Sequence, residues 1–496
     1  MYFQLFALLV ILIGIILVNK KRRKLPPGPV GIPILGYLPF LGKVPSLTVA
    51  ELAKKYGDIM SVYFGQYLVV FINDVDLMKE IGKIDVFLGR NQLELMKPIR
   101  ENCGLIFLEE KGWQEWRRFT LKSLKDMGFG KNSMEGLIQD QVEDFCSFLK
   151  RNVNSPIYLK DPIEVAVINS LWIILAGEKY DIEDPEKREI LKLMNEAFSD
   201  QDILGITAFL PWLARLFPVS TGYSKGLQCL GAPLNLGKTI LAQHKEKYGP
   251  GQEKDFIDLA LTKIYETTDP ASSFYKDVGL KNLVFTVLDI FYTGSDTVSS
   301  TLGWAFLAAA SFPETQWKLQ KEIDEVVGRE KIPSLMDKSK MVYTEAFMFE
   351  VLRKSSMVPF GVMHTALEDA EFHGFFFPKR TILLWNLYGV HHDEKHWGDP
   401  HVFRPERFIN PDGSLRKDDH LVPFFTGKRN CPGDSLAINE FFMFLTGVLQ
   451  RFNVELEDPK TMPDFGQRPG FILKPPAHKL MFTERSAMKC RLDKAG

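Results

Sequence analysis

The chain has 496 residues, of which 45% are hydrophobic and 25% charged, and its formal net charge is −1. This apolar content is ample for one large core, and the nearly neutral charge argues against a nucleic-acid partner. The five cysteines show no regular spacing and form an odd number, so they imply no disulfide framework. We therefore expect the folded part to lie in a reducing compartment.

The N-terminus is the most apolar part of the chain. Residues 1–18 carry almost no polar side chain, and five consecutive cations follow at residues 20–24. A helix of this length rises about 27 Å, just enough to cross a membrane. A cleaved signal peptide is the alternative, but it would carry positive charge before the apolar run and a small-residue cleavage site after it. We therefore predict a transmembrane anchor over residues 1–19 in the endoplasmic reticulum, with the flanking cations and the folded body on the cytoplasmic face.

Residues 20–45 combine the basic residues with a proline-rich stretch that begins at Pro26. Proline fixes φ and removes backbone donors, so this stretch predicts a semi-rigid, extended strap. No second linker, repeat or low-complexity tract follows in the sequence. We therefore expect one large domain over residues 46–496.

Two short alternating runs, Ile59–Phe64 and Tyr67–Phe71, predict strands joined by a turn at Gly65-Gln66. Longer segments have the period of a helix. The predicted helices are Lys111–Lys125, Met134–Leu149, Lys281–Ala310, Glu314–Val327, Thr344–Lys354 and Ser435–Phe452. This order of elements predicts a fold that is mainly α with small β-sheets.

The longest predicted helix contains the sequence TGSDT at residues 293–297. A glycine inside a helix costs about 1 kcal/mol relative to alanine, and Ser and Thr hydroxyls can bond to a carbonyl one turn earlier and bend the helix. A locally distorted helix is one interpretation. Close packing of small residues against a neighbouring helix is the other.

Glu350 and Arg353 are neighbours at i and i+3 on one helical face. A surface pair of this kind contributes only about 0–1 kcal/mol and is common. A second arginine-rich motif, FRPERF at residues 403–408, follows downstream. By themselves these two motifs assign no function.

Near the C-terminus a cysteine lies between two glycines, ahead of a long apolar helix, in the sequence FFTGKRNCPG at residues 424–433. The thiolate is the reactive and metal-binding form of cysteine, and it is favoured by a cation such as Arg429 and by a helix start. We therefore expect Cys431 to act as an anion. A free buried cysteine that behaves as a small hydrophobe is the alternative.

The spacing Phe-x-x-Gly-x-Arg-x-Cys-x-Gly resembles the haem loop of the cytochrome P450 family. The resemblance covers nearly the whole chain from Leu25 onward. It is strongest toward the microsomal drug-metabolising clan, through RRFTL at residues 117–121, PFGVMH at 359–364 and EFHGF at 371–375. It implies the cytochrome P450 fold and a bound haem b, with the Cys431 thiolate as the axial iron ligand whose electron donation favours O–O cleavage. Phe424 and Gly433, at the two ends of the motif, would contact the haem.

The resemblance also assigns roles to the other motifs. Thr297 and Asp296 would manage water and protons at the oxygen-binding position. Thr293 stands where the family usually has alanine or glycine, which bears on the shape of the pocket. Glu350 and Arg353 would form a buried triad with Arg407 that holds the haem-loop scaffold and does no chemistry.

Two buried haem propionates need cationic partners, because an unpaired buried charge is strongly destabilising. The resemblance implies that Arg117 and Arg429 supply the cations. Trp113, which shares a helical face with Arg117, would donate its indole N–H, and His364 would complete the set. Arg90 is a further candidate.

Arg118, Lys122 and Lys125 line an adjacent face of the same predicted helix. In the family such a basic stripe meets acidic patches on a reductase, whereas an ordinary solvated face is the alternative. No flavin or NAD(P) site is visible in the sequence. We therefore expect electrons from NADPH–cytochrome P450 reductase, with cytochrome b5 as a candidate second donor.

His391, His392, His396 and His401 form the densest histidine cluster of the sequence, and a zinc site is the alternative hypothesis for it. The glutamate spacing of a zinc-protease helix is absent, and the Gly398-Asp399-Pro400 sequence breaks a helix there. We expect a structural turn instead.

These patterns together predict a haem-thiolate monooxygenase that inserts one oxygen atom of O2 into an apolar organic substrate, by hydroxylation or epoxidation. A reductase-independent enzyme that rearranges peroxides is a second hypothesis, against which the intact Asp296–Thr297 pair argues. A non-enzymatic haem- or ligand-binding membrane protein is the third. By resemblance the pocket is lined by segments rich in Phe, Leu and Ile, namely residues 90–108, 197–207, 285–297, 358–363 and 471–473. They indicate a lipophilic small molecule but do not distinguish a steroid, terpenoid, fatty acid or foreign compound.

Overall fold

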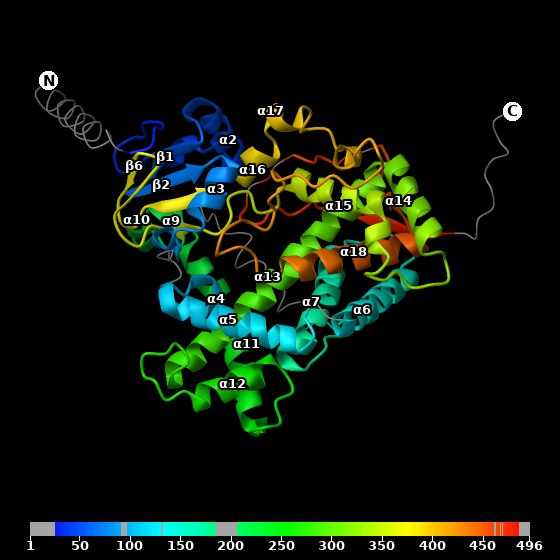
Figure 1. Ribbon diagram of the computed structural model, residues 1–496, viewed down its shortest axis with the longest axis horizontal. Helices are drawn as coiled ribbons and strands as arrows, with labels where there is room; N and C mark the ends of the chain where they lie inside the picture. The colour runs from blue at the N-terminus through cyan, green and yellow to red at the C-terminus, as the bar shows by residue number, and fades with distance from the viewer. Residues whose placement is uncertain are drawn as a thin grey trace, which may run out of the picture.

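A computed structural model describes residues 25–90, 97–129, 132–184, 206–460, 463–466, 468 and 470–485. Within this part of the chain, no helix is both long enough and apolar enough to cross a membrane. The predicted anchor, residues 1–19, lies outside the described residues. The fold is mainly helical with small sheets, as predicted. Figure 1 shows β1, β2 and β6 together on the left side of the molecule and long helices filling most of the rest.

The largest sheet has five strands in the order β1-β2-β7-β4-β3. Its strands are β1 (Ile59–Phe64), β2 (Tyr67–Ile72), β7 (Ile382–Trp385), β4 (His364–Thr365) and β3 (Gly89–Arg90). β1 and β2 are the predicted hairpin, and β2 pairs in parallel with β7. Alternate residues of β2 and β7 enter two separate apolar clusters, because successive side chains of a strand point to opposite faces. The sheet is therefore buried on both faces.

Two smaller sheets complete the β structure. β5 (Ala370–Phe372) pairs with β6 (Phe375–Phe377), and β8 (Phe452–Leu456) pairs with β9 (Leu480–Glu484). The second of these lies beside the helical core, since Phe452, Val454 and Phe482 belong to its apolar cluster.

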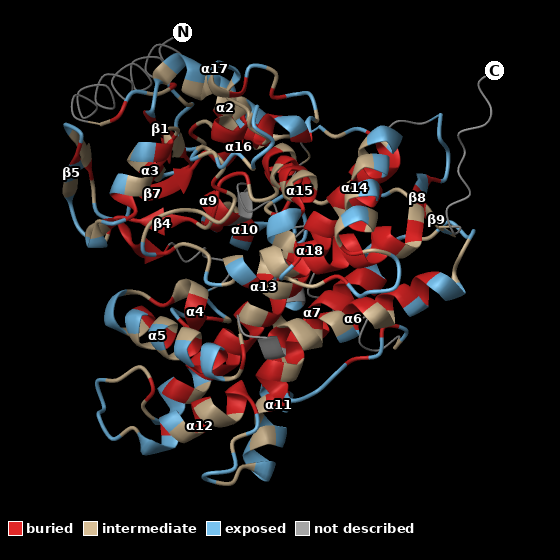
Figure 2. Cartoon of the chain, turned by 45° about the vertical axis from the view of Figure 1, so that its right-hand side comes forward, coloured by how far each residue is buried: buried red, intermediate tan, exposed pale blue. Residues whose placement is uncertain are grey.

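The helical core surrounds α13 (Lys276–Ser311), which is apolar nearly all round and buried over most of its length. Figure 2 shows the buried surfaces of α13, α7 and α18 facing one another at the centre of the molecule. The remaining helices are α2 (Pro45–Tyr56), α3 (Val75–Ile81), α4 (Gly104–Phe107), α5 (Glu110–Asp126), α6 (Asn132–Arg151), α7 (Lys160–Ala176), α9 (Ile206–Phe209), α10 (Pro211–Leu216), α11 (Tyr223–Lys247), α12 (Phe256–Glu266), α14 (Pro313–Val326), α15 (Val342–Ser355), α16 (Leu387–His391), α17 (Glu394–Trp397) and α18 (Asp434–Arg451).

All six predicted long helices are present, as α5, α6, α13, α14, α15 and α18, with ends that differ by at most five residues. The prediction did not include α7, α11 or α12. α7 is buried on every side, so its sequence lacks the polar stripe that marks an amphipathic helix. α11 contains Pro233, which interrupts the helical pattern in sequence.

The proline-rich strap packs against β1. The backbone N–H groups of Ser61 and Tyr37 donate to the carbonyls of Pro27 and Tyr63 at 2.8 and 2.7 Å. A Cβ at Gly28 would lie 1.7 Å from the Ser61 carbonyl oxygen, so only glycine permits this close approach. The strap thus continues the large sheet at its β1 edge.

Candidate functional site

The segment that carries Cys431 is a tight loop between residue 424 and the start of α18. The Cys431 backbone N–H donates to the Phe424 carbonyl at 3.0 Å, and the Lys428 N–H donates to the Gly82 carbonyl at 2.9 Å. Gly427 has φ of +83°, and a Cβ there would lie 2.3 Å from the Gly82 carbonyl oxygen. Gly427 is therefore required both by its conformation and by its close contact with residue 82.

Gly433 differs from Gly427. Its φ is −106°, which any residue adopts, and a Cβ there would have no heavy atom of the chain within 4 Å. The expected tight turn is thus required at Gly427 and not at Gly433. The predicted haem contact of Gly433 stays a prediction.

Burial raises the pKa of the Cys431 thiol, while the Gly433 backbone N–H and the Arg117 guanidinium act in the opposite direction. A thiol in such surroundings becomes a thiolate when a metal cation binds it. The side chain is neither fully buried nor part of a disulfide. Cys431 is therefore available as a metal ligand.

Beside the loop, a cationic cluster is formed by Arg90, Arg117 and Arg429, with Trp113 and His364 beside them. The Arg429 guanidinium lies 4.1 Å from the centre of the Trp113 ring and donates to the carbonyls of Leu88 and Leu108 at 3.1 and 2.7 Å. Burial and the nearby Arg90 and Arg117 lower its pKa to about 8. The second terminal nitrogen of Arg429, Nη1, is buried and has no hydrogen-bond partner among the residues that the structure describes.

Arg90 and His364 face each other across paired strands β3 and β4. Arg90 donates to the carbonyls of Ile106 and Met363 at 3.1 and 3.3 Å, and burial lowers its pKa to about 9. His364 stacks on Trp385 with ring centres 4.6 Å apart. Burial, Arg90 and Arg429 lower its pKa well below the usual range, and its Nδ1 is buried without a partner.

Arg117 reaches the cluster from α5. Its Nη2 donates to the Asn430 carbonyl at 2.9 Å and to the Asn430 side-chain oxygen at 2.8 Å, so it is tied to the residue next to Cys431. Sequence reasoning did not single out Asn430. The pKa of Arg117 is lowered by burial, against the attraction of Cys431 and Asp434.

The cluster fits an anionic ligand. Three guanidiniums lie close enough to lower one another's pKa, and buried polar atoms of Arg429 and His364 have no partner in the part of the chain that the structure describes. Buried cations without counter-ions are strongly destabilising, and guanidiniums are the preferred partners of carboxylates. A haem with its two carboxylates fits this donor set, with Cys431 as the axial ligand.

A small cavity, partly open to solvent, lies between α13 and the Cys431 loop. Thr297, Val298 and Thr301 line it from α13, Met357 and Val358 from the segment after α15, and Phe424 and Ala437 from the loop and α18. Phe424 thus lines this cavity, and its contact with a haem stays a prediction. The lining is mostly apolar, which suits an apolar macrocycle or an apolar substrate.

The TGSDT segment is continuous helix, and its hydroxyls bond back along α13 as expected. The Thr297 hydroxyl donates to the Thr293 carbonyl at 2.6 Å, and the Thr293 hydroxyl donates to the Asp289 carbonyl at 2.7 Å. Thr297 lines the cavity, but Asp296 does not. The Asp296 carboxylate is buried and forms an ion pair with Lys474 at 2.9 Å, a partner that sequence reasoning did not predict.

The predicted triad is present and buried. Glu350 accepts from Arg353 Nε and Nη2 at 2.8 Å each, and Arg407 Nε lies 3.0 Å from the same carboxylate. Arg353 also donates to the carbonyls of His391 and Pro400 at 2.9 Å. The triad therefore joins α15 to the segment that leads into the Cys431 loop.

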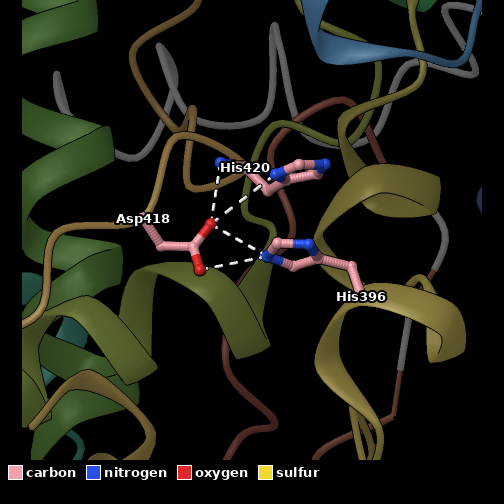
Figure 3. A group of neighbouring side chains, drawn as sticks. All are labelled: His396, Asp418 and His420. Carbon is pink, nitrogen blue, oxygen red and sulfur yellow. Dashed lines mark hydrogen bonds and ion pairs between the residues drawn. The ribbon is translucent and has the colours of Figure 1, made fainter. Parts of the chain in front are cut away.

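The histidine cluster divides in the structure. His391 is buried, accepts the Val422 N–H at 3.1 Å, and lies 3.0 Å from the Ser356 hydroxyl. His396 pairs instead with Asp418 at 2.9 Å, and its ring stacks on His420 (Figure 3).

Donor atoms of His396, Asp418 and His420 lie close enough for one metal ion, but two features favour an ion-pair network. Arg416 already pairs with Asp418 at 2.9 Å. The two imidazole rings are also nearly parallel, with centres 3.6 Å apart, so both lone pairs cannot point at one ion without a rotation of a ring.

A helix-rich fold, a cysteine loop under a long central helix, and a buried cationic cluster together define a haem-thiolate class of protein. The comparisons with known proteins agree. The sequence profile of the Cytochrome P450 family matches residues 26–482. The chain belongs to the cytochrome P450 family, and it is a monooxygenase, an oxidoreductase that incorporates oxygen.

Among its relatives, a farnesoate epoxidase of Bombyx mori is 32% identical over 484 residues, which is 95% of this chain and 97% of the relative. Cytochrome P450 2B2 of Rattus norvegicus is 32% identical over 494 residues, covering 97% and 99% of the two chains. Cytochrome P450 2C8 of Homo sapiens is 32% identical over 468 residues, covering 93% and 94%. The predicted resemblance to the microsomal drug-metabolising clan of the family is thus confirmed.

Proposed function

We propose that this protein is a haem-thiolate monooxygenase of the endoplasmic reticulum membrane that oxidises a lipophilic small molecule with electrons from NADPH, delivered by a separate reductase. The observation that carries the proposal is the position of Cys431. Its loop lies across an apolar cavity from Thr297. It also lies beside a cationic cluster whose three arginines outnumber the carboxylates that oppose their repulsion, Glu109 and Asp434. A bound haem b would supply the activation of dioxygen, which no side chain of the chain can perform.

The chain's own residues would then bind, orient and supply protons. Cys431 would be the axial ligand. Arg90, Arg117 and Arg429, with Trp113 and His364, would hold the two haem carboxylates through charge-assisted hydrogen bonds. Thr297 would orient a proton donor at the cavity wall, and Asp296 on the same helix would take part in proton supply.

The substrate would be apolar and would be hydroxylated or epoxidised. Met357, Val358 and Phe424 line the cavity, and the predicted lining segments at residues 285–297 and 471–473 are described and rich in apolar side chains. Parts of two other predicted segments, residues 91–96 and 197–205, lie outside the described residues. The name of the farnesoate epoxidase relative supports an unsaturated lipid as one class worth testing.

Electrons would enter at the outer face of α5. Arg118, Lys122 and Lys125 are exposed there, and none of them makes an ion pair with a residue that the structure describes. A basic stripe of this kind attracts an acidic partner and speeds association at low salt. We propose NADPH–cytochrome P450 reductase as that partner, with cytochrome b5 as a second candidate and no flavin or NAD(P) held by this chain.

The membrane-facing surface would lie beside the β1–β2 hairpin. The exposed apolar residues Val30, Ile32 and Ile34 are on the strap, and Trp212 and Phe217 are on or just after α10. Both segments adjoin this hairpin: Gly36 bridges to Phe64, and the Phe209 ring packs on the Phe64 ring at 5.1 Å. An apolar surface flanked by polar residues suits insertion into a lipid interface. Liposome flotation of a variant that lacks residues 1–20 tests it, and complete loss of lipid binding would contradict it.

One experiment separates the three functional hypotheses. The full-length protein is reduced and exposed to carbon monoxide, and its spectrum reports thiolate ligation. It is then supplied with NADPH, reductase and a panel of lipophilic compounds. Oxygenated product that requires NADPH supports the proposal. Product formed from a peroxide without NADPH supports the rearranging enzyme, and a thiolate spectrum without product under either condition supports the ligand-binding protein.

A further inference from the structure

A buried ion pair links two segments that are far apart in sequence. Lys474 Nζ lies 2.9 Å from Asp296 Oδ1, and the Tyr292 hydroxyl donates to Asp296 Oδ2 at 3.3 Å. The exposed fraction of the side chain is 1% for Asp296 and 19% for Lys474. The pair therefore joins a fully buried carboxylate to a lysine whose side chain is partly exposed.

The backbone around Lys474 is held in place on both sides. The Leu473 N–H donates to the Met357 carbonyl at 2.7 Å, and the Trp304 indole donates to the Leu473 carbonyl at 2.9 Å. A Cβ at Gly303 would lie 3.0 Å from the Pro475 ring, so the segment rests directly on α13. This fixation aims the Lys474 side chain at Asp296 and makes the pair a built feature.

The charges around the pair come from α13 and from α7. Burial lowers the pKa of Lys474, whereas Asp296 and Glu164 raise it and Lys160 lowers it. Burial and Asp296 raise the pKa of Tyr292 well above its usual range, so Tyr292 remains a neutral donor. Truncating one partner of a buried ion pair leaves the other uncompensated, so the buried Asp296 carboxylate depends on Lys474 for its counter-charge.

We propose that Lys474 is the positioning residue of Asp296, holding this carboxylate through the buried ion pair outside the lining of the cavity, so that proton supply to the Thr297 position depends on Lys474. The inference rests on the proposed monooxygenase function, because that is the reaction that consumes protons. It assigns a role in the proton supply of the TGSDT segment to Lys474, a residue outside that segment.

The test compares Lys474→Met and Lys474→Arg in the full-length, haem-loaded protein with its reductase. Lys474→Met is expected to lower turnover at least about tenfold and to change the pH profile of turnover. This is less than the roughly 10²- to 10⁴-fold contribution of a positioned proton donor itself, because Lys474 acts through Asp296. Lys474→Arg keeps the charge and is expected to restore most of the rate. Lys479→Met is the matched control, since Lys479 pairs with Glu457 at 3.6 Å on an exposed surface, and it is expected to behave as wild type.

A double-mutant cycle gives a readout that does not depend on turnover. Asp296→Asn and Lys474→Met are each expected to lower the urea midpoint of unfolding, and the double variant is expected to be no less stable than either single variant. The same non-additivity is expected in turnover. Additive losses in both measurements would overturn the inference.

The outcomes also separate this inference from the proposed function. If wild-type protein forms product and Lys474→Met keeps the wild-type rate and pH profile while losing stability, Lys474 is a structural ion-pair partner only, and the inference fails alone. If wild-type protein with a thiolate spectrum forms no product with NADPH and reductase, the proposed function fails and the inference falls with it.

Discussion

Two buried clusters of arginine in this protein differ in whether carboxylates of the chain balance their positive charge. In the triad, the Glu350 carboxylate lies between Arg353 and Arg407, and Asp399 gives Arg407 a second carboxylate at 3.0 Å. In the cationic cluster, Arg90, Arg117 and Arg429 repel one another, and Glu109 is the carboxylate that opposes this repulsion at Arg90 and Arg429. The first cluster is complete within the chain, whereas the second needs anions from outside.

The difference separates scaffold from binding site. Burying a charge is costly unless the charge is paired and hydrogen-bonded, so a charge-balanced cluster can be explained by folding alone. An unbalanced one with orphaned donors at Arg429 and His364 indicates a ligand that arrives after or during folding. Arginine thus stabilises the fold in the triad and is proposed to bind a ligand in the cationic cluster. The presence of carboxylate partners within the chain distinguishes the two roles.

The largest expected effect is at the metal ligand. Cys431→Ser is expected to abolish both the thiolate-type carbon monoxide spectrum and product formation, because a neutral hydroxyl cannot donate comparable charge to iron. Absorption spectra of the reduced, carbon monoxide-bound protein check the first part and turnover assays the second. Retention of both would contradict the assignment of Cys431. Cys146→Ser, a substitution at a buried cysteine beside Gly447, is the matched control and should keep the spectrum.

Breaking the triad should unfold the protein whether or not haem is bound. Arg353→Met leaves the Glu350 carboxylate buried with half its partners, at an expected cost of about 3–5 kcal/mol. Arg404→Met is the matched control, because its side chain is exposed and pairs with Asp399, where a loss of about 0–1 kcal/mol is expected. Chemical denaturation measures both. Equal effects would mean that the buried triad is no more important than a surface pair.

Breaking the cationic cluster, in contrast, should have an effect that depends on whether haem is bound. Arg429→Met removes a charge-assisted partner of a haem carboxylate, worth about 1.5–3 kcal/mol, so haem affinity is expected to fall about 10- to 100-fold. In the haem-free protein the loss of two carbonyl contacts is offset by relief of repulsion with Arg90 and Arg117, so the unfolding midpoint should change little. Haem-transfer assays and thermal melts of both forms check this. A large destabilisation of the haem-free form would make Arg429 a scaffold residue like Arg353.

On the cavity side, Thr297→Ala is expected to keep ligand binding and NADPH consumption but to lower the ratio of product to NADPH about tenfold, with hydrogen peroxide as the other product. The reason is the loss of the hydroxyl that orients a proton donor at the cavity wall. Thr301→Val, one turn along the same wall, is the control. A ratio unchanged in Thr297→Ala would make this threonine a packing residue.

Features of the fold and the site that depend on local sequence could be predicted, whereas those that depend on tertiary structure could not. The ends of α5, α14 and α15 were predicted from helical periodicity, because a half-exposed helix has apolar residues at regular helical spacing in its sequence. Cys431, Arg429 and Trp113 were predicted by resemblance of short motifs, and the structure brings Trp113 and Arg429 together.

The partners that were missed are set by tertiary structure. Lys474 belongs to a residue type that usually lies at the surface, and nothing near it in sequence indicates Asp296. Asn430 is an unremarked position within a recognised motif, and its role depends on Arg117 reaching it from α5. The burial of α7 likewise depends on α6 and α13 packing against it.

The smallest expected effect concerns a buried carboxyl group that is neutralised by a proton, and not by a cation of the chain or by a ligand. Glu440 on α18 is buried, accepts from the Ser170 hydroxyl, and has its pKa raised by burial from 4.5 to about 8. The folded state therefore keeps a proton that the unfolded chain loses above about pH 4.5, so this group makes stability fall as pH rises from about 4.5 to about 8. Glu440→Gln is expected to flatten that part of the profile of unfolding free energy against pH, whereas Glu457→Gln, at an exposed pair with Lys479, is not. If the slope of unfolding free energy against pH were unchanged in Glu440→Gln, a cation would have to neutralise Glu440 in the folded protein. Glu440 would then be a paired carboxylate like Glu350 in the triad.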